Sequence, residues 1–460
     1  DGAVVLKETL DPSGAHSDKV FQFAYLNALF ESGFINPIDT AVRECPAPDI
    51  TGFSKLSEEP YDFIRKRLSI LVSHIDLDNK ENYIIITKGA FKNVLDVCQR
   101  AELADGSIVD INRVRNEITG RYEQYSRNGY RTLGIAYKNI GKELKFDRTQ
   151  ESDMIFLGSI ILFDPPKQKV EDTVMCLSKL GVSLKIITGD NRFIAQRVME
   201  QLGFADTKIL TGADLRDIND IALVHRVNET DVFAEVEPNQ KERIILALKK
   251  AGHVVGYMGD GINDVSALHD ADVSISVDSA VDVAKATADI ILMEKDLGVL
   301  CQGIVDGRKT FVNTMKYVFM ATSANFGNMF SMAGVSIFLT FLPLLPKQVL
   351  LTNLLTDLPE MAIATDNVDP GSFEKPHKWD IKFIQKFMLT FGLVSSIFDY
   401  LTFGALLFVV HASEIGFRTG WFTESVLSAA IIVLVIRSKK IFIRSKPGKH
   451  LLIATGAVVI

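Results

Sequence analysis

The feature of this chain that most restricts its fold is a run of thirty residues, 317–346, without a single charged side chain. A helix of about 20 residues spans the hydrocarbon core of a bilayer. Four further apolar stretches follow this run, so we expect five membrane spans, the last of them cut off at the end of the chain. Their expected limits are residues 317–342, 348–364, 387–410, 421–437 and 450–460.

The basic residues of the loops predict how these spans are oriented. Lysine and arginine precede the first span, recur between the second and third spans, and recur again after the fourth. The two intervening loops contain only Lys347 and Arg418. Because cytoplasmic loops carry an excess of basic residues, we predict a multi-pass protein of the cell membrane with residues 1–316 in the cytoplasm.

Composition excludes several other classes of protein. The four cysteines lie far apart and form no CxxC pair, which argues against a disulfide scaffold or a zinc ribbon. The net charge of −7 provides no basic surface for nucleic acid. The chain begins with Asp1 and has no recognisable signal peptide, so we expect it to be part of a longer protein.

The polar part of the chain has two regions. Residues 1–150 are mixed in character, whereas from Met154 short apolar runs rich in β-branched residues alternate with helical patterns. This alternation predicts a doubly wound parallel sheet, with MIFLGSIILF as its first visible strand. Ligands of such sheets bind beyond the carboxyl ends of the strands, so we expect the chemistry there.

Three strand ends carry suitable groups. One expected strand ends in GDGIND, residues 259–264, where two carboxylates on a glycine turn suit Mg²⁺. Another ends in Thr188-Gly189-Asp190, where a hydroxyl and backbone N–H groups can hold an anion. Lys241 begins a helix and can neutralise phosphate. Any one of these could be an ordinary turn, but all three in order favour a phosphate site.

These motifs, together with Asp164-Pro165-Pro166-Lys167 and Lys88-Gly89-Ala90, resemble those of P-type ATPases, which share the haloacid-dehalogenase fold. The resemblance implies an α/β nucleotide-binding domain (residues 1–150), a haloacid-dehalogenase-like phosphorylation domain (residues 151–310) and an all-α transmembrane bundle (residues 311–460). The aspartate that such enzymes phosphorylate lies in a DKTGT sequence, which is not found here. The resemblance therefore places that aspartate, its strand, the actuator domain and the first membrane helices upstream, and this chain alone should not phosphorylate itself.

The resemblance also assigns roles to individual residues, with ATP and Mg²⁺ as cofactors. Asp260 would hold Mg²⁺, with Asp264 and Asn263 supporting the metal loop, and Thr188, Gly189, Asp190 and Lys241 would surround the phosphoryl group. Asp39, Tyr61, Lys88 and Arg131 would contact ATP, with Tyr61 stacked on adenine. Without the resemblance, Tyr61 reads as a half-buried strand aromatic and Arg131 as a solvated surface charge.

The polar residues of the membrane part indicate the transported ion. Asn325 and Asn328 share one helix face, as do Asn353, Thr356 and Asp357 on the next span. Pro359 is expected to break that second helix and to free carbonyl oxygens. Oxygen ligands without cysteine suit a hard cation such as Mg²⁺ or Ca²⁺. The alternative is that the asparagines only hold helices together.

Details of the membrane segments refine the resemblance. Asn353–Asp357 and Asn325 are similar to the ion site of calcium pumps, but Asn328 stands where those pumps have Glu. The segments PHKWD (376–380), SSIFD (395–399) and GWFTE (420–424) are similar to bacterial magnesium-translocating P-type ATPases. We therefore expect an ATP-driven pump for Mg²⁺. The alternatives are a pump for Ca²⁺ or another hard cation, a membrane-tethered phosphatase without transport, and a non-catalytic module. Glu360, Asp399 and Glu424 are left without assigned roles.

Overall fold

The computed structural model describes residues 4–32, 36–62, 65–75, 81–141, 146–163, 170–204, 206–294, 296–438 and 444–460. The chain divides into two compact units. The first unit consists of Asp1–Met175 with Ser183–Asp296, and the second of Cys176–Val182 with Leu297–Ile460. The Asp164–Lys167 motif lies outside the described residues.

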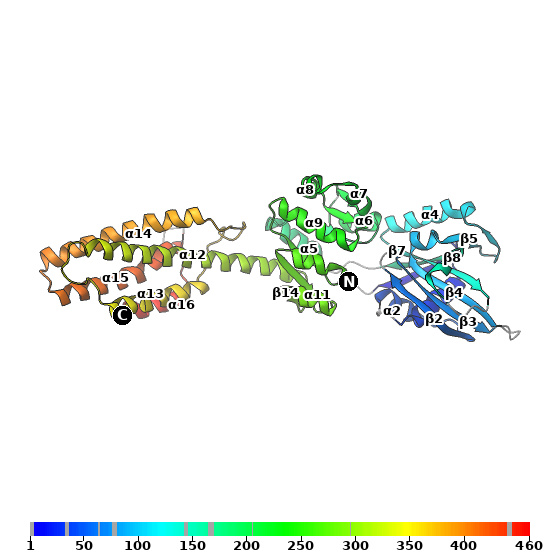
Figure 1. Ribbon diagram of the computed structural model, residues 1–460, viewed down its shortest axis with the longest axis horizontal. Helices are drawn as coiled ribbons and strands as arrows, with labels where there is room; N and C mark the ends of the chain where they lie inside the picture. The colour runs from blue at the N-terminus through cyan, green and yellow to red at the C-terminus, as the bar shows by residue number, and fades with distance from the viewer. Residues whose placement is uncertain are drawn as a thin grey trace. The chain divides into compact units, whose positions relative to one another are not determined.

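The first unit contains an eight-stranded sheet with the order β2-β3-β4-β7-β8-β5-β6 and with β1 beside β8 (Figure 1). All pairs in it are antiparallel except β5 with β8. Its strands are β1 (Val5–Leu10), β2 (Phe53–Asp62), β3 (Arg67–Ile75), β4 (Glu81–Ala90), β5 (Cys98–Glu102), β6 (Ile108–Asp110), β7 (Arg131–Ile140) and β8 (Met154–Phe163). The associated helices are α1 (Asp18–Phe30), α2 (Pro37–Arg43), α3 (Phe91–Leu95), α4 (Ile111–Arg127) and the 3₁₀ turn η1 (Arg148–Gln150).

Both faces of this sheet are covered. Alternate strand residues point to opposite faces, so Ile84 and Ile86 of β4 pack in a core with α1, whereas Ile85 packs in a second core with α3 and α4. Strand β8 follows the same rule, with Ile155 in the first core and Phe156 in the second. The sheet is therefore the centre of a three-layer arrangement.

The position of β8 corrects the sequence analysis, which made this segment the first strand of the second domain. Strand β8 pairs with β7, β1 and β5 in the eight-stranded sheet instead, so this sheet extends beyond residue 150. The physical reason is that a strand covered on both faces reads as a continuous apolar run. Such a run does not indicate which of two sheets the strand joins.

The rest of the first unit consists of parallel strands that alternate with helices, as predicted. In the described residues these strands form two three-stranded sheets, β10-β11-β9 and β12-β13-β14, rather than one continuous sheet. The strands are β9 (Ile186–Ile187), β10 (Ile209–Thr211), β11 (Val232–Ala234), β12 (Gly256–Met258), β13 (Val273–Val277) and β14 (Ile290–Leu292). The helices are α5 (Val170–Lys179), α6 (Arg192–Gln201), α7 (Gly212–Asp217), α8 (Asp220–Glu229), α9 (Pro238–Lys250), η2 (Ile262–Asp264), α10 (Val265–Asp270) and α11 (Asp282–Thr287).

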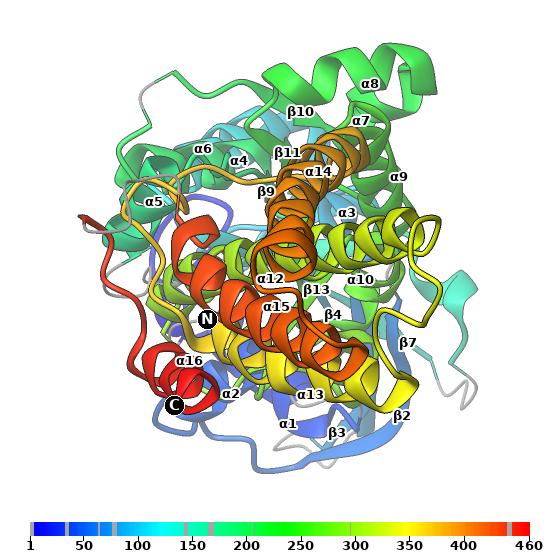
Figure 2. The same cartoon turned by 90° about the vertical axis from the view of Figure 1, so that its left-hand side faces the viewer.

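The second unit is helical. Figure 2 shows its long helices side by side. They are α12 (Gly298–Val335), α13 (Pro346–Ala362), η3 (Ile363–Thr365), α14 (Ile381–Gly404) with a π-turn η4 (Ala405–Val409), α15 (Glu414–Ile436) and α16 (Lys449–Val459). Among the described residues, Ile381–Val409 and Glu414–Ile436 are long and apolar enough to cross a membrane, and Lys449–Val459 is a shorter apolar helix.

Two expectations about these helices are corrected. Helix α12 ends at Val335 rather than near residue 342. Helix α13 continues through Pro359 to Ala362, so the proline does not break it. Proline lacks only its own N–H group, which removes the usual amide donor for the carbonyl of Leu355 four residues earlier. Packing of α13 against α15 and α16 accompanies the unbroken helix.

A buried ionic cluster joins four segments of the second unit. The carboxylate of Asp366, just after η3, accepts hydrogen bonds from Lys316 Nζ of α12 at 2.7 Å and from Arg437 of the α15 end at 2.9 Å. It also accepts one from the backbone N–H of Gly448 at 2.8 Å. The Asp366 side chain is fully buried and that of Arg437 is 1% exposed. The cluster therefore fixes the middle of α12 against the ends of α13, α15 and α16.

Candidate functional site

The loop after β9 brings Thr188 and Asp190 to the end of its sheet. The backbone N–H of Thr188 donates to the carbonyl of Phe233 at 2.9 Å, which continues the ladder with β11. The Thr188 hydroxyl accepts a hydrogen bond from the backbone N–H of Asp190 at 3.1 Å. The Asp190 carboxylate pairs with Arg131 at 2.6 Å. Arg131, predicted to contact ATP, therefore lies beside the predicted phosphoryl loop and not beside Lys88.

A second group forms where α9 meets the loop after β12. The Asp264 carboxylate accepts hydrogen bonds from Lys241 Nζ at 2.7 Å and from the Tyr257 hydroxyl at 2.6 Å. Burial raises the pKa of Asp264, but the attraction of Lys241 and these hydrogen bonds outweigh it, so that the pKa lies below its ordinary value. Burial and the Asp264 charge raise the pKa of Tyr257. Asp264 is thus an ionised group that positions Lys241.

The glycines of this loop are required by its geometry. A Cβ atom on Gly259 would lie 2.5 Å from Cβ of Asp264, which is too close for any side chain. The backbone N–H of Gly261 donates to the other Asp264 oxygen at 3.1 Å. Donors thus surround the Asp264 carboxylate, whereas Asp260 is exposed. The role of Asp260 as a cation ligand, with Asn263 and Asp264 in the supporting loop, stays a prediction. Among the described residues no three His, Cys, Asp or Glu side chains converge on one point.

In the eight-stranded sheet domain, the predicted ATP residues Asp39 and Lys88 are in direct contact. Both are buried, and Lys88 Nζ forms an ion pair with Asp39, which lies in the first turn of α2. Glu31 lies 3.8 Å from the same ammonium group. Burial, followed by the hydrogen bond with Asp39, raises the pKa of Glu31 to about 7. Sequence reasoning missed Glu31, because an acidic residue just after a helix carries no distinguishing pattern.

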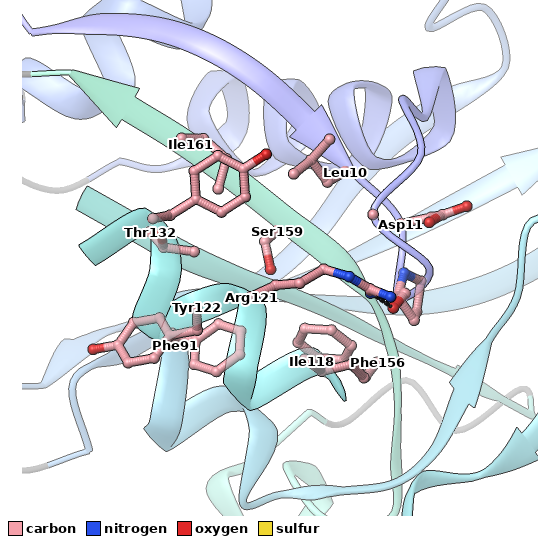
Figure 3. A pocket seen from close by; sticks show the side chains of 13 residues that line it. Leu10, Asp11, Phe91, Ile118, Arg121, Tyr122, Thr132, Phe156, Ser159 and Ile161 are labelled. Carbon is pink, nitrogen blue, oxygen red and sulfur yellow. Dashed lines mark hydrogen bonds between the residues drawn. The ribbon is translucent and has the colours of Figure 1, made fainter. Parts of the chain in front are cut away.

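Tyr61 lies at the end of β2 and is 46% exposed, so its ring is accessible. A separate small cavity lies between α4 and the sheet (Figure 3). The stacked rings of Phe91 and Tyr122 line it, with centroids 4.3 Å apart, together with the buried hydroxyl of Thr132. Its volume of about 20 Å³ holds about one water. This cavity is too small for a nucleotide.

The second unit contains a larger cavity, of about 70 Å³, between α12, α13 and α15. Three of the five predicted cation ligands line it, namely Asn325, Asn328 and Asn353. The other lining residues are Met329, Met332, Leu344, Val349, Thr352, Trp421 and Ser425. The sequence analysis did not predict Thr352 and Ser425 as residues of this site, because single hydroxyl residues in apolar helices are common.

The remaining two predicted ligands lie elsewhere on α13. The Thr356 hydroxyl donates to the backbone carbonyl of Thr352 at 3.0 Å, and Asp357 is exposed. Neither residue lines the cavity. Glu360, one turn further on, is buried. The asparagines are therefore the part of the predicted ion site that the structure brings together.

Asp399 and Glu424 have a different environment from the cavity residues. Asp399 of α14 is buried and accepts hydrogen bonds from the Ser331 hydroxyl at 2.6 Å and from the indole N–H of Trp421 at 3.2 Å. Glu424 of α15 lies next to it and is hydrogen-bonded to it. Since these donors come from α12 and α15, Asp399 connects three helices.

Family models match two parts of this chain. Residues 47–169 match the one described as P-type ATPase, cytoplasmic domain N. Residues 341–460 match the one described as cation transporting ATPase, C-terminus. The first match covers most of the eight-stranded sheet and the second covers α13–α16.

Comparison with curated proteins extends the similarity to nearly the whole chain. It is 39% identical to the magnesium-transporting ATPase, P-type 1, of Escherichia coli (strain K12), over 99% of this chain and 52% of that protein. The protein of the same description in Salmonella typhimurium (strain 14028s / SGSC 2262) is 39% identical over 99% of this chain and 51% of its own length. Calcium-transporting ATPase 1 of Bacillus cereus is 30% identical over 80% of this chain and 41% of its own length. The chain thus spans about half the length of these magnesium-transporting relatives.

Proposed function

Because this chain belongs to the P-type ATPase family, we propose that it is part of an ATP-driven pump that moves Mg²⁺ across the cell membrane. The observation that carries the proposal is the cavity of the second unit, which asparagines from both α12 and α13 line. The greater identity to magnesium-transporting than to calcium-transporting relatives supports Mg²⁺ as the cargo.

In this proposal the first unit binds ATP and handles the phosphoryl group. Lys88 leaves its ion pair with Asp39 to follow the nucleotide phosphates, and Tyr61 stacks on adenine. Thr188 and Lys241 bind the transferred phosphoryl oxygens, with Lys241 held in place by Asp264 at 2.7 Å. Mg²⁺, when bound at Asp260, neutralises charge that develops on these oxygens.

The phosphorylated aspartate belongs, in this proposal, to a strand upstream of this chain. Strands β9 and β12 are each at the edge of a three-stranded parallel sheet. One more parallel strand between them would join the two sheets into one. The carboxyl end of that strand would then lie between Thr188, which follows β9, and Asp260, which follows β12. This supports the upstream segment as the partner that completes the catalytic site.

The second unit carries the transport path in this proposal. Its five helices are membrane spans, and residues 1–316 are cytoplasmic, in agreement with the distribution of basic residues in the loops. Polar side chains within a membrane-spanning segment are costly and mark functional paths. Asn325, Asn328 and Asn353 are therefore assigned to the cation. Thr356 and Asp357 do not line the cavity and are assigned to the entrance of the path.

The test is an ion-flux measurement with the complete polypeptide, including its upstream segment, in liposomes with ATP outside. Lumenal Mg²⁺ and Ca²⁺ are followed with separate dyes. We expect an ATP-dependent Mg²⁺ change that Asp260→Asn abolishes and that Asn328→Ala weakens. Asp306→Asn, which changes an exposed carboxylate of α12, is the control and should behave like the unmodified protein.

Each other result identifies an alternative function. A Ca²⁺ change without a Mg²⁺ change would mean that the similarity of Asn353–Asp357 to calcium pumps decides the cargo. ATP hydrolysis without flux of either ion would mean a membrane-bound phosphatase. Wild-type hydrolysis in Asp260→Asn would show that the metal site is assigned wrongly.

A further inference from the structure

The cavity between α12, α13 and α15 has no charged side chain among the described residues that line it. Its polar groups are amides and hydroxyls, from Asn325, Asn328, Asn353, Thr352 and Ser425. The carboxylate on the same stretch of α13, Asp357, does not line it and is exposed. A divalent cation that enters this cavity therefore meets neutral oxygen atoms.

Thr352 lines this cavity and has a buried polar group without a partner in the part of the chain that the structure describes. The residue is 4% exposed, and its hydroxyl oxygen has no hydrogen-bond partner among the described residues. Thr322 and Thr356 of this unit donate to a carbonyl one turn earlier, that of Val318 and of Thr352 respectively. Thr455 of α16 is also buried without a partner in the described chain, but it does not line this cavity. A buried hydroxyl without a partner is unfavourable. The Thr352 hydroxyl is therefore available to form a hydrogen bond with a ligand or a water in the cavity.

The neutral polar groups of the cavity indicate the form of the ion. Mg²⁺ gives up its water reluctantly and is stripped of it by carboxylates or phosphates, whereas Ca²⁺ binds six to eight oxygens directly. Amides and hydroxyls compete weakly for the inner shell, but they hydrogen-bond well to its waters. A water occupies about 30 Å³ in the liquid, so the volume of about 70 Å³ holds roughly two waters. Asn325 and Asn353 at its edge are exposed, so the cavity is open there and the rest of a water shell can extend beyond it.

We propose that this cavity receives Mg²⁺ with most of its water shell retained, and that Thr352 is a specificity-determining residue that hydrogen-bonds to that shell. This inference rests on the proposed transport function. Asn325 and Asn328 act on the same shell from α12, while Asn353 and Thr352 act on it from α13. A cation that must shed its water to bind gains little from these groups, so the cavity discriminates against Ca²⁺.

The probe for the test is hexaamminecobalt(III), a cation of similar size to hydrated Mg²⁺ whose ligands do not exchange. The complete polypeptide in detergent, without ATP, is titrated with MgCl₂ and with hexaamminecobalt(III) by calorimetry. We expect both cations to bind and to compete with each other. Thr352→Val, which keeps the shape but removes the hydroxyl, should weaken both affinities by about three- to tenfold, the value of one hydrogen bond.

Two further variants separate this role from a structural one. Thr352→Ser keeps the hydroxyl and should retain both affinities, whereas Thr322→Val removes a hydroxyl that is already hydrogen-bonded and should change neither. Failure of hexaamminecobalt(III) to compete with bound Mg²⁺ would overturn the inference, as would unchanged affinities in Thr352→Val. If the wild type transports no Mg²⁺ in liposomes, the proposed function fails. Binding of hexaamminecobalt(III) that Thr352→Val does not weaken would then overturn the inference as well.

Discussion

Removal of the buried charge of Asp366 should strongly destabilise the second unit. Its carboxylate faces the ammonium of Lys316 at 2.7 Å and the guanidinium of Arg437 at 2.9 Å, and the latter side chain is 1% exposed. In Asp366→Asn the two cations stay buried without the carboxylate that contacts them both. Breaking a buried ion pair in this way costs about 3–5 kcal/mol. For a unit of about 170 residues, this corresponds to a fall in Tm of about 6–20 °C.

Tryptophan fluorescence of the 460-residue chain in detergent measures this effect selectively. Both tryptophans of the chain, Trp379 and Trp421, lie in the second unit, and Trp421 is buried. The thermal transition of the emission spectrum therefore reports on that unit. Asp306→Asn is the matched control, because Asp306 is a largely exposed carboxylate on the same helix as Lys316, and its Tm should match that of the unmodified chain.

A double variant tests the cause of the destabilisation. Asp366→Asn combined with Lys316→Met leaves one uncompensated cation in place of two, so it should recover part of the lost Tm. Equal transitions for Asp366→Asn and Asp306→Asn would refute the argument from burial. So would a double variant whose loss equals the sum of the two single losses, because the charges would then act independently.

Three further predictions concern the first unit and the cavity. Burial raises the pKa of Glu31 from 4.5 to about 7, so the folded protein binds this proton more tightly than the unfolded chain does. Stability should therefore fall as the pH rises from about 4.5 to about 7, and urea unfolding should show a smaller fall in Glu31→Gln. Gly259→Ala places a Cβ atom 2.5 Å from Asp264, which displaces Lys241, so phosphorylation of the complete polypeptide by ATP should be lost while ATP binding persists. Asn328→Asp adds a carboxylate to the neutral cavity, and calorimetry should detect tighter Ca²⁺ binding relative to Mg²⁺.

Sequence patterns predicted the features that depend on local chemistry. Long apolar helices follow from composition, and α14 and α15 overlap the expected spans 387–410 and 421–437, although each begins six or seven residues earlier. Asp39 and Lys88, both predicted to contact ATP, form an ion pair, and their role in ATP binding stays a prediction. The glycines of the GDGIND loop were expected to permit a sharp turn, and the close approach of Gly259 to Asp264 gives the reason for one of them.

Features that depend on long-range packing could not be predicted from the sequence. Strand β8 was assigned to the wrong sheet, because an apolar run is compatible with any doubly covered strand. Pro359 was expected to interrupt α13, yet the helix continues through it. Thr352 carries no pattern that distinguishes it from Thr356, and only its unsatisfied hydroxyl in the folded chain sets it apart.

Helix α12 connects the ionic cluster to the cavity without interruption. Its 38 residues correspond to a rod about 57 Å long, with Lys316 near its centre and Asn325 and Asn328 about three turns further on. A rotation that turns the two asparagines out of the cavity must also pull Lys316 away from Asp366, because an intact helix twists as one body. Helix α12 therefore turns only when the contact between Lys316 and Asp366 breaks. The Lys316 ammonium and the amides of both asparagines then change their surroundings in a single step.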